Sequence, residues 1–389
     1  MRVTPAGMCV QRGGASRPSR RAVLGGLVAL GGTGLACRAA AWAAGAAPAI
    51  TVAWRGSTGN RTLAPAAIQG DRIIVAGEAT AEAWTLDGAR VWTSPLATAA
   101  NFAPRPASER VVIAGRKGLS VLDVADGRIA WRATPTEAFG APLVHGDRLL
   151  VGDGSDLAAF AMADGAPLWR YTVHGTAGIF YAPAARDNTV FLGAGDGHLT
   201  ALDADSGAVL WSVDRSGRWQ YLRQLAFTGD GGVLVAGGYD DAVYGLDPGD
   251  GAILWRFEAG NFINSQLVHD GGVYFWSPTG WVIGLDARTG ERRWRTRTHR
   301  FGSDGGTDWD PIMAEVRASG PWLWVLDMGH RVHVLDRANG REVGAPKLPF
   351  RARPFVTPTA DPDRLVFGTV EGDVVMVRVT GLPVDAPME

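Results

Sequence analysis

The sequence predicts an all-β fold, an eight-bladed β-propeller of four-stranded antiparallel blades. Three observations predict it. A Gly-x-x-x-Trp element recurs at near-regular spacing along the chain. Short apolar runs separated by Gly/Asp turns precede each copy, which is the pattern of a β-hairpin. Helical periodicity is hard to find after residue 50, whereas the 53 Gly and 22 Pro indicate many turns.

The Gly-x-x-x-Trp element defines six complete repeat units. Its copies are Gly88/Trp92, Gly127/Trp131, Gly165/Trp169, Gly207/Trp211, Gly251/Trp255 and Gly290/Trp294. In each unit a turn leads into a β-branched run, a hairpin, a strand that ends in Leu-Asp or a variant of it, and a strand that carries the Trp. A short inner strand precedes these three. Each unit therefore supplies four strands, as a propeller blade does.

Two further units are degenerate. In "WLWVLDMGHRVHVLDRANGREVG" the Trp position is Gly344, and "DRLVFGTVEGDVVMVRVTG" ends after its third strand. The segment "ITVAWRG" at residues 50–56 carries Trp54 but has no hairpin before it. We predict that this segment pairs with residues 373–379 and completes the last blade, which closes the ring. The count is then eight blades of about 43 residues each.

The residues of the repeat have evident structural roles. In "ALDADSGAVLW", residues 201–211, we expect Asp203 to accept hydrogen bonds from turn amides and Gly207 to adopt a positive φ. We expect Trp211 to dock flat against the neighbouring blade. The predicted docking residues are Trp54, Trp92, Trp131, Trp169, Trp211, Trp255 and Trp294.

Residues 1–43 are predicted to be an export signal. Residues 19–24, "SRRAVL", resemble a twin-arginine signal, and residues 41–43 offer a small-x-small cleavage site. The apolar stretch of about 15 residues is short for a membrane span, which needs about 20. We therefore predict a single propeller domain over residues 44–389, periplasmic or extracellular, without a transmembrane segment. A retained anchor helix and a lipid anchor on Cys37 remain alternatives.

Charge and cysteine content exclude several classes of function. The first 43 residues hold six Arg and no acidic residue, so their removal changes the formal net charge from −1 to −7. So acidic a chain has little attraction for phosphate backbones, and we expect no nucleic-acid partner. The two cysteines, Cys9 and Cys37, both precede residue 44. Removal of the predicted signal therefore leaves no cysteine for a disulfide or a zinc site. His330 and His333 are expected to face opposite sides of one strand. We predict no metal site and a monomeric protein.

The element Ala201-Leu202-Asp203-x-x-Ser206-Gly207-x-x-x-Trp211 closely resembles the tryptophan-docking motif of the pyrroloquinoline-quinone (PQQ) repeat superfamily. The resemblance covers essentially all of residues 44–389 and implies a propeller. It leaves function open, because that superfamily includes both quinoprotein alcohol dehydrogenases and BamB-like scaffolds. The first interpretation is a non-catalytic envelope propeller that binds an unidentified protein or small molecule, with no cofactor.

The second interpretation is a reduced PQQ-dependent dehydrogenase. Trp309-Asp310 precedes "VLDRANG" at residues 334–340, so the resemblance implies Asp310 as the catalytic base, with PQQ and calcium as cofactors. Three features depart from that family: the Asn of its calcium-binding segment is replaced at 274–279, the adjacent-cysteine disulfide is missing, and so are the long insertions over the cofactor. Another enzyme chemistry at the same site is a third interpretation. The departures favour the non-enzymatic one.

The starts of the inner strands are expected to ring the mouth of the central channel. The predicted ligand-binding residues there are Tyr181, Tyr221, Arg223, Phe262, Asn264, Asp308, Trp309 and Arg353, and Asn60 holds an equivalent place. The interval from Trp294 to Gly344 is 50 residues, against 38 to 44 elsewhere, because "FGSDGGTDWDPI" lengthens it. A loop longer than its siblings favours function. Large side chains that plug the channel, and a neutral insertion, remain alternatives.

A concentration of arginines occurs in the run "ERRWRTRTHR", residues 291–300, on a predicted outer strand. Its arginines suit either a solvated sheet edge or an anionic partner.

Overall fold

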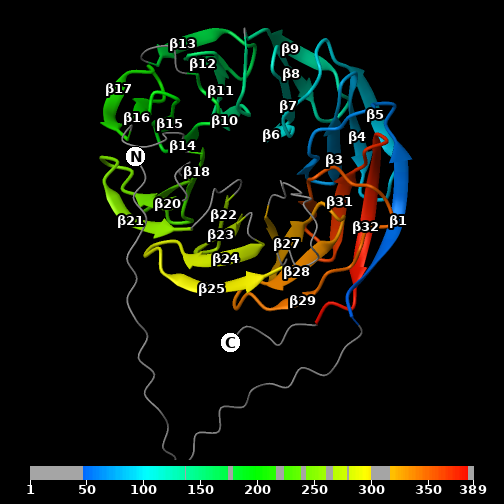
Figure 1. Cartoon of the computed structure of the whole chain (residues 1–389). Helices are drawn as coiled ribbons and strands as arrows, with labels where there is room; N and C mark the ends of the chain where they lie inside the picture. Colours follow the sequence, from blue (N-terminus) through cyan, green and yellow to red (C-terminus); the bar gives the residue numbers. More distant parts are fainter. Residues whose placement is uncertain are drawn as a thin grey trace, which may run out of the picture. The chain divides into compact units, whose positions relative to one another are not determined.

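The computed structural model describes residues 47–383, except 136, 174–177, 216–222, 238–241, 260–265, 278–279 and 299–315. Within these residues the regular structure consists of strands in eight four-stranded antiparallel sheets. Figure 1 shows the sheets following one another around a ring. The prediction of an all-β, eight-bladed propeller is confirmed.

Blades 1 to 4 each use four strands that are consecutive in sequence. Blade 1 contains β2 (Ala67–Gln69), β3 (Arg72–Ala76), β4 (Thr80–Thr85) and β5 (Arg90–Pro95). Blade 2 contains β6 (Arg105–Ala107), β7 (Arg110–Gly115), β8 (Gly118–Asp123) and β9 (Ile129–Ala133). Blade 3 contains β10 (Leu143–His145), β11 (Arg148–Asp153), β12 (Asp156–Ala161) and β13 (Pro167–Thr172). Blade 4 contains β14 (Ala184–Arg186), β15 (Thr189–Gly193), β16 (His198–Asp203) and β17 (Val209–Asp214).

Blades 5 to 7 follow the same plan, and blade 8 joins the two ends of the chain. Blade 5 contains β18 (Arg223–Phe227), β19 (Leu234–Gly237), β20 (Ala242–Leu246) and β21 (Ile253–Glu258). Blade 6 contains β22 (Gln266–His269), β23 (Gly272–Ser277), β24 (Trp281–Asp286) and β25 (Arg292–Arg297). Blade 7 contains β26 (Arg317–Ser319), β27 (Trp322–Leu326), β28 (Val332–Asp336) and β29 (Glu342–Gly344). Blade 8 contains β30 (Thr357–Pro358), β31 (Arg364–Gly368), β32 (Asp373–Thr380) and β1 (Ala49–Ser57).

The first strand of the described residues completes the last blade. β1 pairs antiparallel with β32 from Ala49↔Thr380 to Ser57↔Asp373, with one irregularity between Val52 and Trp54. Figure 1 shows β1 in blue beside β32 in red. The first described strand is therefore the outer strand of the last blade, as the isolated "ITVAWRG" segment predicts.

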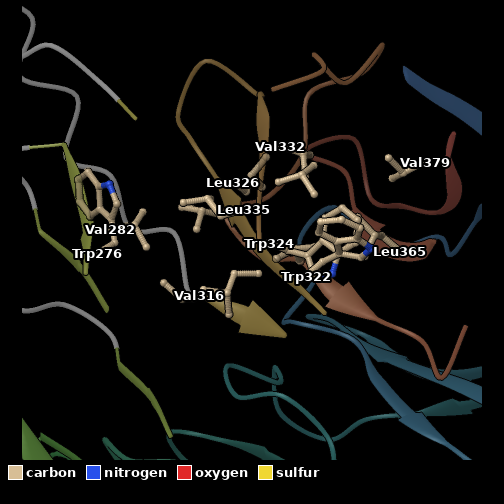
Figure 2. Close-up of a cluster of buried hydrophobic side chains, with 14 of the residues drawn as sticks. Trp276, Val282, Val316, Trp322, Trp324, Leu326, Val332, Leu335, Leu365 and Val379 are labelled. Carbon is tan, nitrogen blue, oxygen red and sulfur yellow. The ribbon is translucent and has the colours of Figure 1, made fainter. Parts of the chain in front are cut away.

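The core lies between neighbouring blades. The two middle strands of a blade are buried along nearly their whole length, because another blade packs on each face. Leu149 and Val151 of β11, for example, belong to the same buried cluster as Val112 and Trp131 of blade 2. Figure 2 shows the equivalent cluster around blade 7, where Trp322 and Trp324 lie near Leu365 of blade 8. Outer strands instead alternate between exposed and buried residues. Burying both faces of the middle strands explains their continuous apolar runs.

Each docking Trp packs on the turn glycine of the next blade. These glycines have positive φ, and a β-carbon on any of them would lie within 3 Å of the incoming indole. The pairs, Trp first, are Trp54/Gly88, Trp92/Gly127, Trp131/Gly165, Trp169/Gly207, Trp211/Gly251, Trp255/Gly290 and Trp294/Gly340. Six of the indole N–H groups donate hydrogen bonds to carbonyls of the same turns, at 2.8 to 3.2 Å. Glycine is required at these turns both for its backbone conformation and for space.

The junction of blades 7 and 8 uses a different contact. Gly344 stands at the Trp position of blade 7, and a β-carbon there would lie 2.8 Å from Cδ of Pro48, just before β1. The missing indole is thus replaced by close packing of the N-terminal segment.

Candidate functional site: the channel mouth

A cavity of about 770 Å³ lies where the inner strands begin. All eight blades contribute to its lining, in blade order through Pro65, Phe102, Pro142, Tyr181, Gln224, Gln266, Arg317 and Phe355. Each of these residues is at or just before the first residues of an inner strand. The repeat itself therefore builds the cavity, since it brings eight equivalent strand starts to one end of the channel.

The cavity wall combines aromatic faces with hydrogen-bonding groups. Phe102, Tyr181 and Phe355 supply the aromatic surface, and Asn101 supplies an amide. The charged side chains among the described lining residues are Arg105 and Arg317. A pocket of this size that combines apolar surface with a few placed polar groups is typical of ligand sites in proteins.

Two glutamines from adjacent blades form a fixed pair in this wall. The N–H of Gln266 donates to Oε1 of Gln224 at 2.6 Å, and Nε2 of Gln266 donates to the Gln224 carbonyl at 2.8 Å. Gln224 has a φ of 48°, next to an irregularity in the pairing of β18 with β19. A left-handed backbone at a non-glycine residue costs roughly 1–2 kcal/mol, and such strain clusters at functional sites. Sequence reasoning missed both glutamines, because neither residue type signals this geometry.

The structure brings some of the predicted site residues to the cavity. Tyr181 lines it, and Arg353 lies two residues before the lining residue Phe355. Arg223 begins β18, but its side chain lies outside the described part of the structure, as do Tyr221, Phe262, Asn264, Asp308, Trp309 and Asp310. The lengthened loop likewise lies outside it. The roles given to these residues therefore stay predictions.

Asn60 does not face the channel. Its side chain is 3% exposed, and Oδ1 accepts hydrogen bonds from the N–H groups of Ala79 and Thr80, both at 3.0 Å. The adjoining residues are held by Glu78, whose carboxylate accepts N–H bonds from Arg61 and Thr62 at 2.7 and 2.6 Å. Partial burial opposes ionisation of Glu78, but a hydrogen bond from the Thr62 hydroxyl together with these N–H bonds outweighs it and lowers its pKa to about 2. Asn60 therefore fixes a turn instead of meeting a ligand.

A buried polar cluster in blade 7 lies apart from the cavity. His333 is 3% exposed; its Nδ1 lies 2.6 Å from Oε1 of Glu342, and its Nε2 lies 3.2 Å from Oδ2 of Asp327. Burial by itself lowers the pKa of His333, but the two hydrogen bonds to carboxylates outweigh it and raise the pKa to about 9. Sequence reasoning considered His333 only as a metal ligand and missed these partners, which come from β29 and from the residue after β27.

The described residues do not fit a PQQ–calcium site. Calcium takes six to eight oxygen ligands, usually including carboxylates. No Asp or Glu lines the cavity within the described residues, and that part of the chain holds no group of three or more His, Cys, Asp or Glu that could bind a metal ion. Ser277, in the segment that resembles the family's calcium-binding strand, is buried at 1% exposure. The described wall therefore supplies no ligand set for this cofactor.

Comparison with known proteins places the chain in a family. The family model described as outer membrane protein assembly factor BamB matches residues 40–142, 122–228 and 218–349, which is most of the chain. The chain belongs to this family of PQQ-repeat propellers. The expected membership in the PQQ-repeat superfamily is thereby confirmed.

Curated relatives match this BamB-like chain only in part. BamB of Pseudomonas aeruginosa is 27% identical over 202 residues, which cover 48% of this chain and 48% of the relative. The serine/threonine-protein kinase AfsK of Streptomyces griseus is 36% identical over 126 residues, or 30% of this chain and 15% of the kinase. The matched regions thus span about half of these relatives or less, and the relatives' activities do not transfer directly.

Solved structures share the fold of this BamB-like chain. BamB from Moraxella catarrhalis has a TM-score of 0.64 at 19% identity and covers 85% of this chain and 97% of its own. A europium-containing methanol dehydrogenase has a TM-score of 0.65 at 14% identity, with coverages of 85% and 93%. At such identities the likeness shows the fold alone, which scaffold and enzyme share.

In the described residues, no helix has the length and apolar character needed to cross a membrane.

Proposed function

We propose that this protein is an exported, non-catalytic β-propeller of the cell envelope that binds a segment of a partner protein at the mouth of its channel. The observation that carries the proposal is the cavity to which all eight blades contribute. Membership of the BamB family supports a scaffold role in the envelope. The departures from the dehydrogenase pattern and the lining without carboxylates, over the described residues, favour binding over catalysis.

The chemistry of the wall suits a polypeptide segment. Aromatic faces such as those of Tyr181 and Phe102 bury apolar or flat groups at low entropic cost. The exposed amide of Asn101 can hydrogen-bond with the backbone N–H and C=O groups of such a segment. Because hydrogen bonds hold the glutamine pair in place, little ordering of the wall accompanies binding, which favours affinity.

Site-specific photo-crosslinking in the native host tests the proposal. A photoreactive phenylalanine analogue replaces Tyr181 at the cavity, and a matched control carries it at Thr93, an exposed residue of β5 on the outside of blade 1. We expect a discrete crosslinked protein from position 181 and none from position 93. No crosslink at 181, or the same pattern from both positions, would argue against a partner at the mouth.

Two further arms test the remaining parts of the proposal. Purified protein mixed with PQQ and calcium should show no rise in melting temperature, whereas micromolar binding would overturn the non-catalytic assignment. The variant Arg20→Lys/Arg21→Lys should keep the protein in the cytoplasm and abolish the crosslink, because a receptor reads the paired arginines. Unchanged export of that variant would remove the twin-arginine assignment.

A further inference from the structure

The outer strand of blade 6 carries an unusual concentration of positive charge. β25 reads Arg-Arg-Trp-Arg-Thr-Arg, with Trp294 buried and all four arginines exposed. β25 ends its sheet, with only β24 hydrogen-bonded to it, so its other edge presents backbone N–H and C=O groups without a strand partner in the described residues. Figure 1 shows β25 on the outer circumference of the ring. Such an edge is a template for a further strand.

Arginines outnumber acidic residues in the sequence of β24 and β25. Residues 281–298, which span β24 and β25, hold five Arg against two acidic residues, Asp286 and Glu291. Arg293 bonds Asp286 at 2.7 Å. The guanidinium of Arg295 lies 4.3 Å from the ring centroid of Trp281, and that of Arg297 lies 5.5 Å from it. Stacking on an indole orders a guanidinium but leaves its positive charge in place.

Protection of an exposed edge does not account for so many arginines. Every other outer strand contains at most one Arg and no Lys: β1, β5, β9, β13, β17, β21 and β29. Where a single Arg occurs, a carboxylate usually lies nearby, as Glu258 does at 3.0 Å from Arg256. Seven outer strands thus carry one Arg or none, whereas β25 carries four.

We propose that β25 is a docking edge for an acidic, extended polypeptide segment of a partner protein. The segment adds as a fifth strand to blade 6 through backbone hydrogen bonds, a known mode of peptide recognition. Arg295 and Arg297 are two residues apart and share a face with Trp281, so carboxylates at alternate positions of the segment meet them. Arg293 is the extra residue at the irregularity in the pairing with β24, and with Arg292 it extends the charge to the start of the strand.

This site is separate from the channel mouth and does not rest on the function proposed for it. Its charges are exposed and screened by salt, so binding weakens as ionic strength rises. Carboxylate recognition and strand addition require different properties of the bound segment. The first requires its negative charge, and the second requires its free backbone amides. The two can therefore be tested independently.

The experiment titrates fluorescent dodecapeptides of alternating Glu and Thr onto the purified full chain at low salt. A second peptide has Gln for every Glu, and a third keeps every Glu but carries an N-methyl group on every backbone amide, which removes the N–H donors of both edges and prevents strand addition. We expect micromolar binding of the first peptide, and a loss of about tenfold or more for the other two. Equal affinity for the Glu and Gln peptides, or for the methylated and unmethylated peptides, would overturn the proposal.

Protein variants locate the site. Arg295→Gln/Arg297→Gln should weaken binding of the Glu peptide about tenfold. The matched control is Arg132→Gln, because exposed Arg132 follows Trp131 on β9 just as Arg295 follows Trp294. Arg132→Gln and the channel variant Tyr181→Ala should both bind the peptide as the unmodified protein does. Equal losses in the β25 and β9 variants would show nonspecific attraction and exclude docking at β25. The peptide comparison on the unmodified protein stands even if a variant fails to fold.

Discussion

At the scale of single residues, His333 shows how blade 7 holds an outer strand that has no docking Trp. Its imidazole joins β28 to Glu342 of β29 and to Asp327 after β27, so one side chain links three parts of the blade. Two carboxylates around a buried imidazole stabilise its protonated form. The cluster therefore stabilises the blade only while His333 carries its proton.

This cluster makes stability depend on pH in a defined window. The pKa of His333 is about 9 in the folded protein, against about 6.5 in an unfolded chain. A raised folded pKa gives stability that is fully present below about pH 6.5 and is lost as pH rises through about 9. We expect the free energy of unfolding in urea to fall by about 2 to 3 kcal/mol between these limits.

The variant His333→Gln separates this effect from other titrations. It should be less stable at pH 6.5 and show a smaller loss on going to pH 9.5, whereas His145→Gln, at a half-buried position of blade 3, should keep the full pH dependence. An unchanged slope in His333→Gln would contradict the role given to the cluster.

At the scale of the blade, sequence repetition reveals what the units share and hides what one unit does differently. The Gly-x-x-x-Trp spacing predicted the strands, the turn glycines and the completion of blade 8, because these features recur and have one physical cause. It could not predict the contact of Gly344 with Pro48 or the His333 cluster, each of which occurs in a single blade. The strained Gln224 also escaped prediction, since its conformation depends on Gln266, 42 residues away.

The docking turn can be tested with two glycines of blade 3. Gly165 has a φ of 78°, and a β-carbon on it would lie 2.6 Å from Trp131; Gly146 has a φ of 58° and nothing within 4 Å. Both Gly→Ala variants carry backbone strain of roughly 1–2 kcal/mol. Gly165→Ala also overpacks the docking site, which adds about 1–3 kcal/mol. Thermal melts should therefore rank Gly165→Ala below Gly146→Ala, and equal melting temperatures would contradict indole docking as the reason for glycine.

At the scale of the whole molecule, the ring depends on the pairing of β1 with β32, two strands that are over 300 residues apart in sequence. Trp54 of β1 stacks on Trp84 of blade 1, with ring centroids 6.0 Å apart, and donates to the carbonyl of Leu86 at 2.9 Å. β1 therefore completes blade 8 and also docks it on blade 1. The channel mouth needs this closure, because its lining includes both Phe355 of blade 8 and Pro65 of blade 1.

Deletion of residues 49–56 tests ring closure most directly. It removes the partner of β32 and a half-buried docking Trp; loss of a fully buried Trp typically costs about 3–5 kcal/mol. We predict a markedly lower melting temperature for the truncated chain, and its recovery when a synthetic peptide of residues 47–58 is added. Val52→Ser is the matched control, since that exposed β1 side chain should leave the melting temperature unchanged. A truncated chain that melts cooperatively at the full-length temperature, with no response to the peptide, would contradict closure of the propeller by its N-terminal strand.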